Sequence, residues 1–243
     1  TGILPMTEPE TRLTLEAPGG PVGVRARCRD GRVEAVTLSA LPSFVHRLDA
    51  ALDVPGLGTI RADVAYGGDS FALVDAAALG FALEPGEARA IAELGARIAA
   101  AATERIGFAH PENPDWRHVS FCLFQGPLAR GADGGLSARQ AVAIRPGKID
   151  RSPCGTGCAA RMAAMAARGE MGPGDRFSAT SLIGSRFDCA IAGAARVGDT
   201  PAIAPEITGR AWITGARQLM LDPHDPWPHG YRLGDTWPGA GAD

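Results

Sequence analysis

The segment Asp150–Arg168 reads DRSPCGTGCAARMAAMAAR, a proline, cysteine and glycine cluster followed by an alanine-rich run. Ala, Met and Arg are strong helix formers, so the run predicts a helix from about Gly155 to Arg168, ended by Gly169. Cys154 then stands at the N-terminus of that helix, where backbone N–H groups lack partners and the helix dipole adds partial positive charge. Both effects favour a thiolate, and we expect the pKa of Cys154 to lie below the ordinary value of about 8.5.

The residues around Cys154 are suited to bind an amino acid. Gly155 and Gly157 have no side chain and allow a ligand to approach the backbone closely. The amides of Gly155 and Thr156 can bind a carboxylate, as helix N-termini bind anions, and Asp150 can accept a hydrogen bond from an ammonium group. The pattern predicts a thiolate placed against the α-carbon of a free amino acid. A structural cysteine remains the alternative, because free Cys is usually a small buried hydrophobe.

The five cysteines are odd in number and widely scattered, which argues for free thiols in a reducing compartment rather than a disulfide framework. We therefore expect a cytoplasmic protein. Cys158 lies one helical turn beyond Cys154 and is predicted to face the core, as are the cysteines of apolar strands, Cys28, Cys122 and Cys189. Zinc is disfavoured because no histidine or second cysteine pair lies nearby in sequence, and we expect no metal.

Composition argues against several classes of protein. With 45% hydrophobic and 21% charged residues, the 243-residue chain has ample apolar material for a core. A net charge of −3 provides no basic excess for binding a nucleic-acid backbone, and no apolar run has membrane-spanning length. Lys148 is the single lysine, which argues against a pyridoxal phosphate Schiff base. We expect no cofactor.

Outside the cysteine segment the chain mostly alternates in the manner of strands. Pro85–Ile106 is predicted as a helix, since proline suits a first helical turn and the following Gly107 can end it. Ser43–Pro55 has a mixed pattern that fits a linker or a short helix, and Asp222–Pro238 is predicted as coil. Many strands with two well-separated helices predict an α+β fold. The predicted strands are Thr11–Glu16, Val22–Cys28, Arg32–Leu41, Ile60–Tyr66, Phe71–Asp75, His118–Phe124, Gln140–Arg145, Leu182–Ile191, Ala202–Ile207 and Ala211–Leu221.

The run DRSPCGTG at Asp150–Gly157 closely resembles the second catalytic motif of the proline racemase family. The resemblance covers nearly the whole chain. It implies a fold like that of diaminopimelate epimerase, with two similar domains that each curl a mixed sheet around a central helix, and an active site between them. We expect residues 1–54 and 215–243 to belong to an incomplete first domain, and residues 55–214 to form the second domain with the catalytic cysteine. Further matching segments are Gly2–Thr14, Tyr66–Phe71, Ser181–Phe187, Pro205–Gly215 and Asp222–Pro238.

The resemblance also implies roles for single residues. In racemases and epimerases of this family, two cysteines face opposite sides of the substrate α-carbon, and no cofactor or metal is used. Cys154 would be the acid/base of the second domain, and Asp150 would contact the ring nitrogen. Gly155 and Thr156 would bind the carboxylate through their amides, and His118 matches a family histidine that contacts the substrate. From its spacing alone, His118 is better read as a surface histidine at a strand end.

The first catalytic motif of the family, in which a Cys, Ser or Thr precedes a Gly-His or similar pair and a helix, is absent from this sequence. Thr1-Gly2 resembles the end of the helix that follows that motif, so we expect the N-terminal part of the family to be missing. A thiolate that takes a proton from one face cannot deliver one to the other. We therefore expect little or no racemase activity from the 243 residues alone, and exposed apolar surface in the first domain.

The implied function is cofactor-independent proton abstraction and donation at the α-carbon of free proline or hydroxyproline, of the 4-hydroxyproline 2-epimerase type. trans-3-Hydroxy-L-proline dehydratase is the alternative within the family, because the residue in the first motif separates the two activities. Two further classes stay open, namely a cysteine hydrolase, which would need a histidine base, and an inactive fragment that only binds amino acids. The expected partner is a small-molecule substrate, without nucleic acid or membrane; a homodimer stays open.

Overall fold

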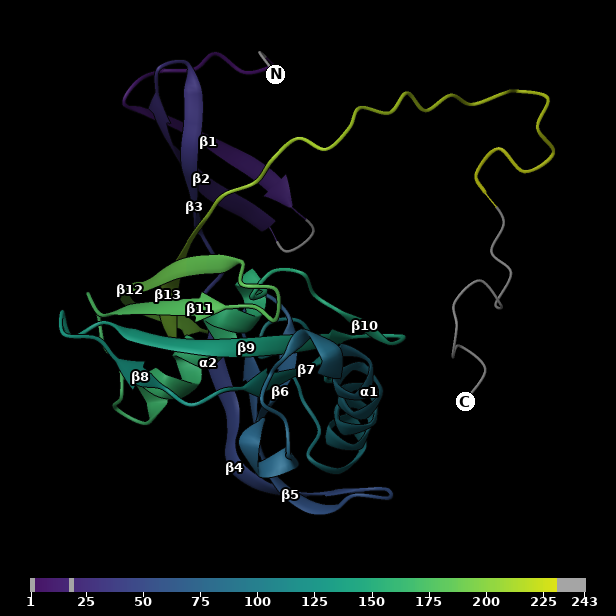
Figure 1. The fold of residues 1–243 in the computed structure, drawn as a ribbon. Coiled ribbons are helices and arrows are strands. Elements are labelled where there is room, and N and C mark those ends of the chain that lie inside the picture. The colour runs from purple at the N-terminus through teal and green to yellow at the C-terminus, as the bar shows by residue number, and fades with distance from the viewer. Residues whose placement is uncertain (1–2, 18–19, 231–243) are drawn as a thin grey trace.

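The alanine-rich run after Cys154 forms helix α2, Gly155–Ala167, which lies inside a strongly curled sheet (Figure 1). The computed structural model describes residues 3–17 and 20–230. Every α2 residue from Gly157 to Met165 is buried. Small alanine side chains let strands approach the helix closely, and helix and sheet together form the core of this part of the chain.

The described residues form one mixed sheet in the order β1-β2-β3-β13-β12-β11-β9-β7-β6-β5-β4, with the short strands β8 and β10 paired to β9. Most neighbouring strands are antiparallel, whereas β6–β7 and β9–β11 are parallel. The strands are β1 Glu10–Ala17, β2 Gly20–Arg29, β3 Arg32–Ser39, β4 Phe44–Val54, β5 Gly58–Tyr66, β6 Ser70–Asp75, β7 Phe121–Gln125, β8 Ala129–Arg130, β9 Leu136–Ile144, β10 Lys148–Ile149, β11 Arg176–Thr180, β12 Arg186–Val197 and β13 Thr200–Gly209.

The sheet closes around α2 because its far strand, β4, returns beside β13. A backbone bridge joins Ser43, just before β4, to Ile203 of β13. Towards β11–β13, the helix packs Cys158, Met162 and other side chains against an apolar cluster. Towards β5–β9, the smaller alanines of the helix pack against a second cluster of leucine, valine and phenylalanine. The central helix is therefore enclosed on both sides.

The second long helix, α1 (Ala88–Arg105), lies outside the curled sheet against β7 and β9 (Figure 1). Two short 3-10 helices, Ala77–Leu79 and Pro85–Glu87, precede it. Gly95 permits the contact, since a Cβ there would lie 2.3 Å from the Cβ of Ala143 on β9. None of the helices within residues 3–17 and 20–230 combines the length and the apolarity needed to cross a membrane.

Strands β1–β3 project from the curled body as an antiparallel meander (Figure 1). The meander joins the body through β3, which pairs with β13 from Glu206 opposite Ser39 to Gly209 opposite Val36. Most of the large, exposed hydrophobic side chains lie in two regions. One is the β1–β3 arm together with the described residues before β1, and the other is residues 210–230, which form no helix or strand. Apolar side chains are therefore exposed in these parts of the chain, as expected.

The predicted α+β fold is confirmed, and three local predictions need correction. Ser43–Pro55 is neither linker nor short helix but contains strand β4, whose two register shifts obscure the alternating pattern. Ala211–Leu221 forms no strand, since it alternates in sequence but has no neighbouring strand to pair with. Strand β11 was not predicted. Of Asp222–Pro238, residues 222–230 are coil as predicted, whereas residues 231–238 and the Thr1-Gly2 pair lie outside the described residues.

The pairing of β4 with β5 bears on the expected domain division. A boundary after Val54 separates two strands that are hydrogen-bonded along almost their whole length. Few contacts cross a domain boundary, and β4 pairs with β5 far more extensively than β3 pairs with β13. The three-part division remains a prediction, and the pairing favours a first boundary that precedes β4.

Candidate active site

Cys154 is the N-cap residue of α2 and has an unusual backbone conformation, with φ 65° and ψ 111°. A positive φ is costly for a residue with a side chain, and such strain is typical of functional positions. Two hydrogen bonds hold the conformation. The Cys154 N–H donates to Ser152 Oγ at 3.0 Å, and the Cys154 carbonyl accepts from the Cys158 N–H at 2.8 Å. The side chain is half-buried, whereas the other four cysteines are buried.

The thiol of Cys154 has a high pKa, opposite to the expectation from its place at a helix N-terminus. Burial raises the pKa to about 12, because desolvation disfavours the thiolate. The hydrogen bonds from the Thr156 side chain, 3.4 Å away, and from the Gly157 amide lower it, while the negative charge of Asp150 raises it. The helix terminus therefore acts in the expected direction, but desolvation outweighs it. The net effect on the pKa favours the thiol over the thiolate.

Asp150 lies beside Cys154 and is tied to it by a turn. Its Oδ1 accepts hydrogen bonds from both the N–H and the Oγ of Ser152, each at 3.1 Å. Ser152 Oγ in turn accepts the Cys154 N–H. These bonds use only Oδ1 of the carboxylate and leave Oδ2 available. Ser152 was missed in the sequence analysis, although Asp followed two residues later by Ser is a common turn pattern.

The amides of Gly155 and Thr156 lie in the first turn of α2, where no intrahelical acceptor exists. Both residues are half-buried. Their N–H groups therefore lie next to the Cys154 thiol at the positive end of the helix dipole. Cys154, Asp150, Gly155 and Thr156 form a compact group, as the sequence predicted.

A second segment, Gly67–Ser70 between β5 and β6, packs on this first helical turn. A Cβ at Gly67 would lie 2.1 Å from the Thr156 carbonyl oxygen, and one at Gly68 would lie 3.0 Å from the Thr156 Cγ2. Only glycine permits this approach. Asp69 follows in the same segment, and burial raises the pKa of its carboxyl group. Sequence spacing could not place these residues on α2, because the contact joins positions about ninety residues apart.

His118 contacts the Gly67–Ser70 loop and not Cys154 itself. Its imidazole is exposed and stacks on the Trp116 ring, with the ring centres 5.9 Å apart. The Ser70 hydroxyl donates to the His118 carbonyl oxygen at 2.7 Å. A positive charge on His118 lowers the pKa of Asp69. No hydrogen bond within the described chain joins His118 to Cys154 or Asp150, and β7 begins at Phe121 rather than at His118.

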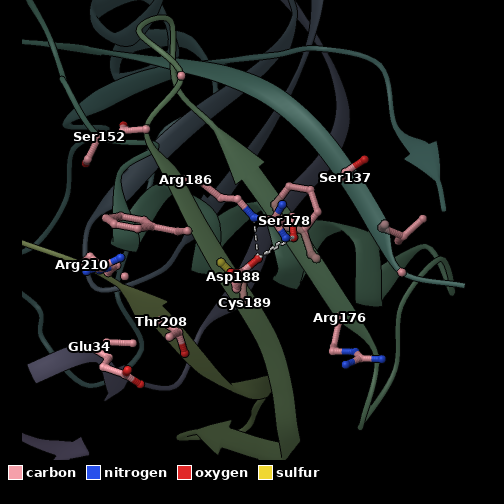
Figure 2. Close-up of a pocket in the computed structure, with 18 of the residues that line it drawn as sticks. Glu34, Ser137, Ser152, Arg176, Ser178, Arg186, Asp188, Cys189, Thr208 and Arg210 are labelled. Carbon is pink, nitrogen blue, oxygen red and sulfur yellow. Dashed lines mark hydrogen bonds and ion pairs between the residues drawn. The ribbon is translucent and has the colours of Figure 1, made fainter. Parts of the chain in front are cut away.

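An open hollow of about 1400 Å³ adjoins the cysteine segment (Figure 2). Arg151 and Ser152 line it from that segment, whereas Cys154 and Thr156 do not. Its floor includes Asp188 of β12, which binds Ser178 and Arg186 through hydrogen bonds. Cys189 also borders it. Within the part of the chain that the structure describes, no group of three or more His, Cys, Asp or Glu side chains is arranged to hold a metal ion.

Comparison with known proteins identifies a family and solved structures with the same fold. Residues 1–232 match the protein family described as proline racemase. A hydroxyproline epimerase from Agrobacterium vitis, solved with bound trans-4-hydroxy-L-proline, is 42% identical, with a TM-score of 0.86 over 98% of this chain and 67% of its own. A probable proline racemase from Agrobacterium radiobacter K84, solved with bound carbonate, is 41% identical, with a TM-score of 0.86 over 99% and 69%. A methylitaconate-delta-isomerase, 12% identical with a TM-score of 0.54 over 86% and 66%, shares the fold alone.

Proposed function

The chain belongs to the proline racemase family, and we propose that it exchanges the α-proton of free proline or hydroxyproline, in the manner of a 4-hydroxyproline 2-epimerase. One observation carries the proposal: the half-buried thiol of Cys154 stands at the N-terminus of α2, where it senses the charge of Asp150 and accepts a hydrogen bond from the Gly157 amide. This arrangement offers a partner for each group of an α-amino acid. The similarity to a hydroxyproline epimerase solved with trans-4-hydroxy-L-proline supports the ring-containing substrate.

Binding would use the two ends of the cysteine segment. The substrate carboxylate would accept hydrogen bonds from the amides of Gly155 and Thr156, with help from the helix dipole. Oδ2 of Asp150, which its own turn leaves free, would accept from the protonated ring nitrogen. His118, on the exposed side of the Gly67–Ser70 loop, would contact the ring. These contacts would place the α-carbon against Cys154.

Proton transfer would then follow from the change in charge around the sulfur. The ring ammonium neutralises Asp150, whose charge raises the pKa of Cys154 in the free protein. It therefore lowers that pKa, and the thiol releases its proton to solvent to become a thiolate. The thiolate takes the α-proton, the S–H bond forms, and the electron pair of the broken C–H bond moves into the substrate carboxylate. The amides of Gly155 and Thr156 stabilise the added negative charge, and the reverse step returns a proton to the same face.

Inversion needs a second acid or base on the opposite face of the α-carbon. Cys28, Cys122, Cys158 and Cys189 are buried, and Cys189, which borders the open hollow, is only 3% exposed. We therefore expect the 243-residue chain to exchange the α-proton of one epimer without inverting it. A dehydratase would instead lose the 3-hydroxyl group after proton removal, which gives a different product from trans-3-hydroxy-L-proline.

The test is proton NMR in heavy water with trans-4-hydroxy-L-proline, cis-4-hydroxy-D-proline and trans-3-hydroxy-L-proline as separate substrates. We expect loss of the α-proton signal from one of the first two. Cys154→Ala should slow exchange by about 100-fold to 10,000-fold, the usual contribution of an acid/base group. Cys122→Ala, at a buried core cysteine, is the matched control. Exchange by the Cys154 variant at the wild-type rate would refute the proposal, whereas loss of water from the 3-hydroxy substrate would identify a dehydratase.

Five free cysteines support a reducing compartment, and the proposed location is the cytoplasm. The proposed ligand is a free amino acid rather than a macromolecule. A homodimer is tested by light scattering of the purified chain.

A further inference from the structure

A buried side chain outside the cysteine segment binds the backbone just before Cys154. Gln140 lies on β9 and is fully buried, with 0% of its surface exposed. Its Nε2 donates to the Pro153 carbonyl oxygen at 2.7 Å and to the Cys158 sulfur at 3.3 Å. One amide group therefore contacts residues on both sides of Cys154.

The orientation of this amide is dictated by Arg161 of α2. Arg161 is only 2% exposed, and its hydrogen bonds go to uncharged oxygens, among them the Gln140 Oε1 at 3.2 Å and the Gly126 carbonyl at 2.7 Å. Its guanidinium also lies over the ring of Phe177, 5.2 Å from the centre. Arginine has donors and no acceptor, so Arg161 can face only the oxygen of Gln140. The amide nitrogen must then point to Pro153.

The Pro153 carbonyl belongs to the peptide group that precedes Cys154, and the orientation of this group sets the φ angle of Cys154. A relaxed cysteine would avoid the observed φ of 65°, so the flanking peptides must be held in place. Ser152 Oγ and the Cys158 N–H hold the Cys154 backbone from within the segment. Gln140 holds it from the sheet. Without that anchor, the peptide could rotate and carry the thiol away from the first turn of α2.

We infer that Gln140, oriented by the buried Arg161, is a positioning residue that holds the thiol of Cys154 on the substrate α-carbon. This role rests on the proposed proton exchange at Cys154. It differs from a purely structural role because its effect is on the reactivity of one sulfur. It also gives a role to Arg161, a buried arginine of the central helix that makes no ion pair with a carboxylate of residues 3–17 or 20–230 and whose desolvation is costly.

The sharpest variant is Gln140→Glu. Glutamate keeps the size of the side chain and keeps an oxygen for Arg161, but a carboxylate cannot donate to Pro153. We expect kcat for α-proton exchange to fall by about 100-fold, the cost of a misplacement near 1 Å, while KM stays within about threefold. The matched control is Gln125→Glu, since Gln125 is the cross-strand partner of Gln140 on β7 and none of its side-chain hydrogen bonds reaches the cysteine segment in the described chain.

A second readout does not depend on turnover. Iodoacetamide should alkylate Cys154 several-fold faster in Gln140→Glu than in the wild-type chain, because a released thiol is less desolvated and its pKa falls, while the charge of the new carboxylate is neutralised by Arg161. Tandem mass spectrometry distinguishes Cys154 from Cys158, which share the tryptic peptide Ser152–Arg161. Thermal melting shows whether the variant is folded. If Gln140→Glu does not fold, Gln140→Met, which removes both polar contacts without adding charge, takes its place in both assays.

The two readouts separate the two proposals. Unchanged kcat and unchanged alkylation in Gln140→Glu would overturn the positioning role, as would equal effects in Gln125→Glu. If the wild-type chain exchanges no proton on any proline derivative, the proposed function fails. The alkylation rates then still decide whether Gln140 holds the Cys154 thiol.

Discussion

Replacing Thr156 by valine should make the Cys154 thiol a weaker acid. Valine keeps the shape of threonine and removes only the hydroxyl group, which lies 3.4 Å from the sulfur and lowers its pKa. The backbone amide of residue 156 is unaffected by the change. The substitution therefore isolates one hydrogen bond at the proposed acid/base group.

The size of the effect follows from the strength of that bond. Hydrogen bonds to charged groups contribute about 1.5–3 kcal/mol, and sulfur is a weak acceptor, so we take the lower limit. That free energy corresponds to about a tenfold smaller thiolate population at a fixed pH below the pKa. A more basic thiolate is also a better nucleophile, with a Brønsted coefficient of about 0.4–0.5, which recovers part of the loss. Alkylation of Cys154 should therefore slow by about threefold to fourfold.

The assay is the rate of iodoacetamide labelling of Cys154 between about pH 8 and about pH 10, measured by mass spectrometry. Thr59→Val, at an exposed position of the β4–β5 hairpin, is the control. Asp150→Asn should have the opposite effect, because the charge of Asp150 raises the pKa of the thiol. Faster labelling in Thr156→Val, or slower labelling in Asp150→Asn, would refute this account of the sulfur's electrostatics.

Three further outcomes test the packing around the site. Gly67→Ala should lower the melting temperature and speed the labelling of Cys154, since the new Cβ would lie 2.1 Å from the Thr156 carbonyl oxygen; a variant with wild-type melting and labelling would contradict the close approach. Arg168→Met should destabilise the chain by about 1–3 kcal/mol in urea unfolding, because it leaves the buried Asp63 carboxylate without its bidentate partner. Arg168 is itself partly exposed, so solvent weakens the pair. An unchanged urea midpoint would show that the pair contributes nothing to stability. A dye that fluoresces on apolar surface should bind the native chain through the exposed side chains of the β1–β3 arm and residues 210–230, and absence of binding would show that this surface is covered in solution.

Local sequence was sufficient for the parts of the site that lie within one short segment. Helix formers and glycines predicted the helix after Cys154, and the DRSPCGTG run placed Asp150, Gly155 and Thr156 next to the thiol. The expected proline racemase family and a fold like that of diaminopimelate epimerase are confirmed. Short-range backbone preferences decide such features, and the residues that carry them are neighbours in the chain.

Contacts between distant segments were not predictable in this way. β4 was misread because its irregular pairing with β5 breaks the alternation, and Ala211–Leu221 was misread because alternation does not supply a partner strand. Gln140 and Gly67 carry no local signal of their positions beside Cys154, since each reaches it from another part of the sheet.

The sequence by itself determined the place of Cys154, the proposed acid/base, at a helix N-terminus and its neighbours within the eight-residue run DRSPCGTG. Only the tertiary structure decided the protonation of that group. The helix terminus favours a thiolate, but the packing around Cys154 removes water and raises its pKa to about 12. Desolvation depends on every segment that covers the sulfur, and those segments are brought together only when the sheet closes around α2.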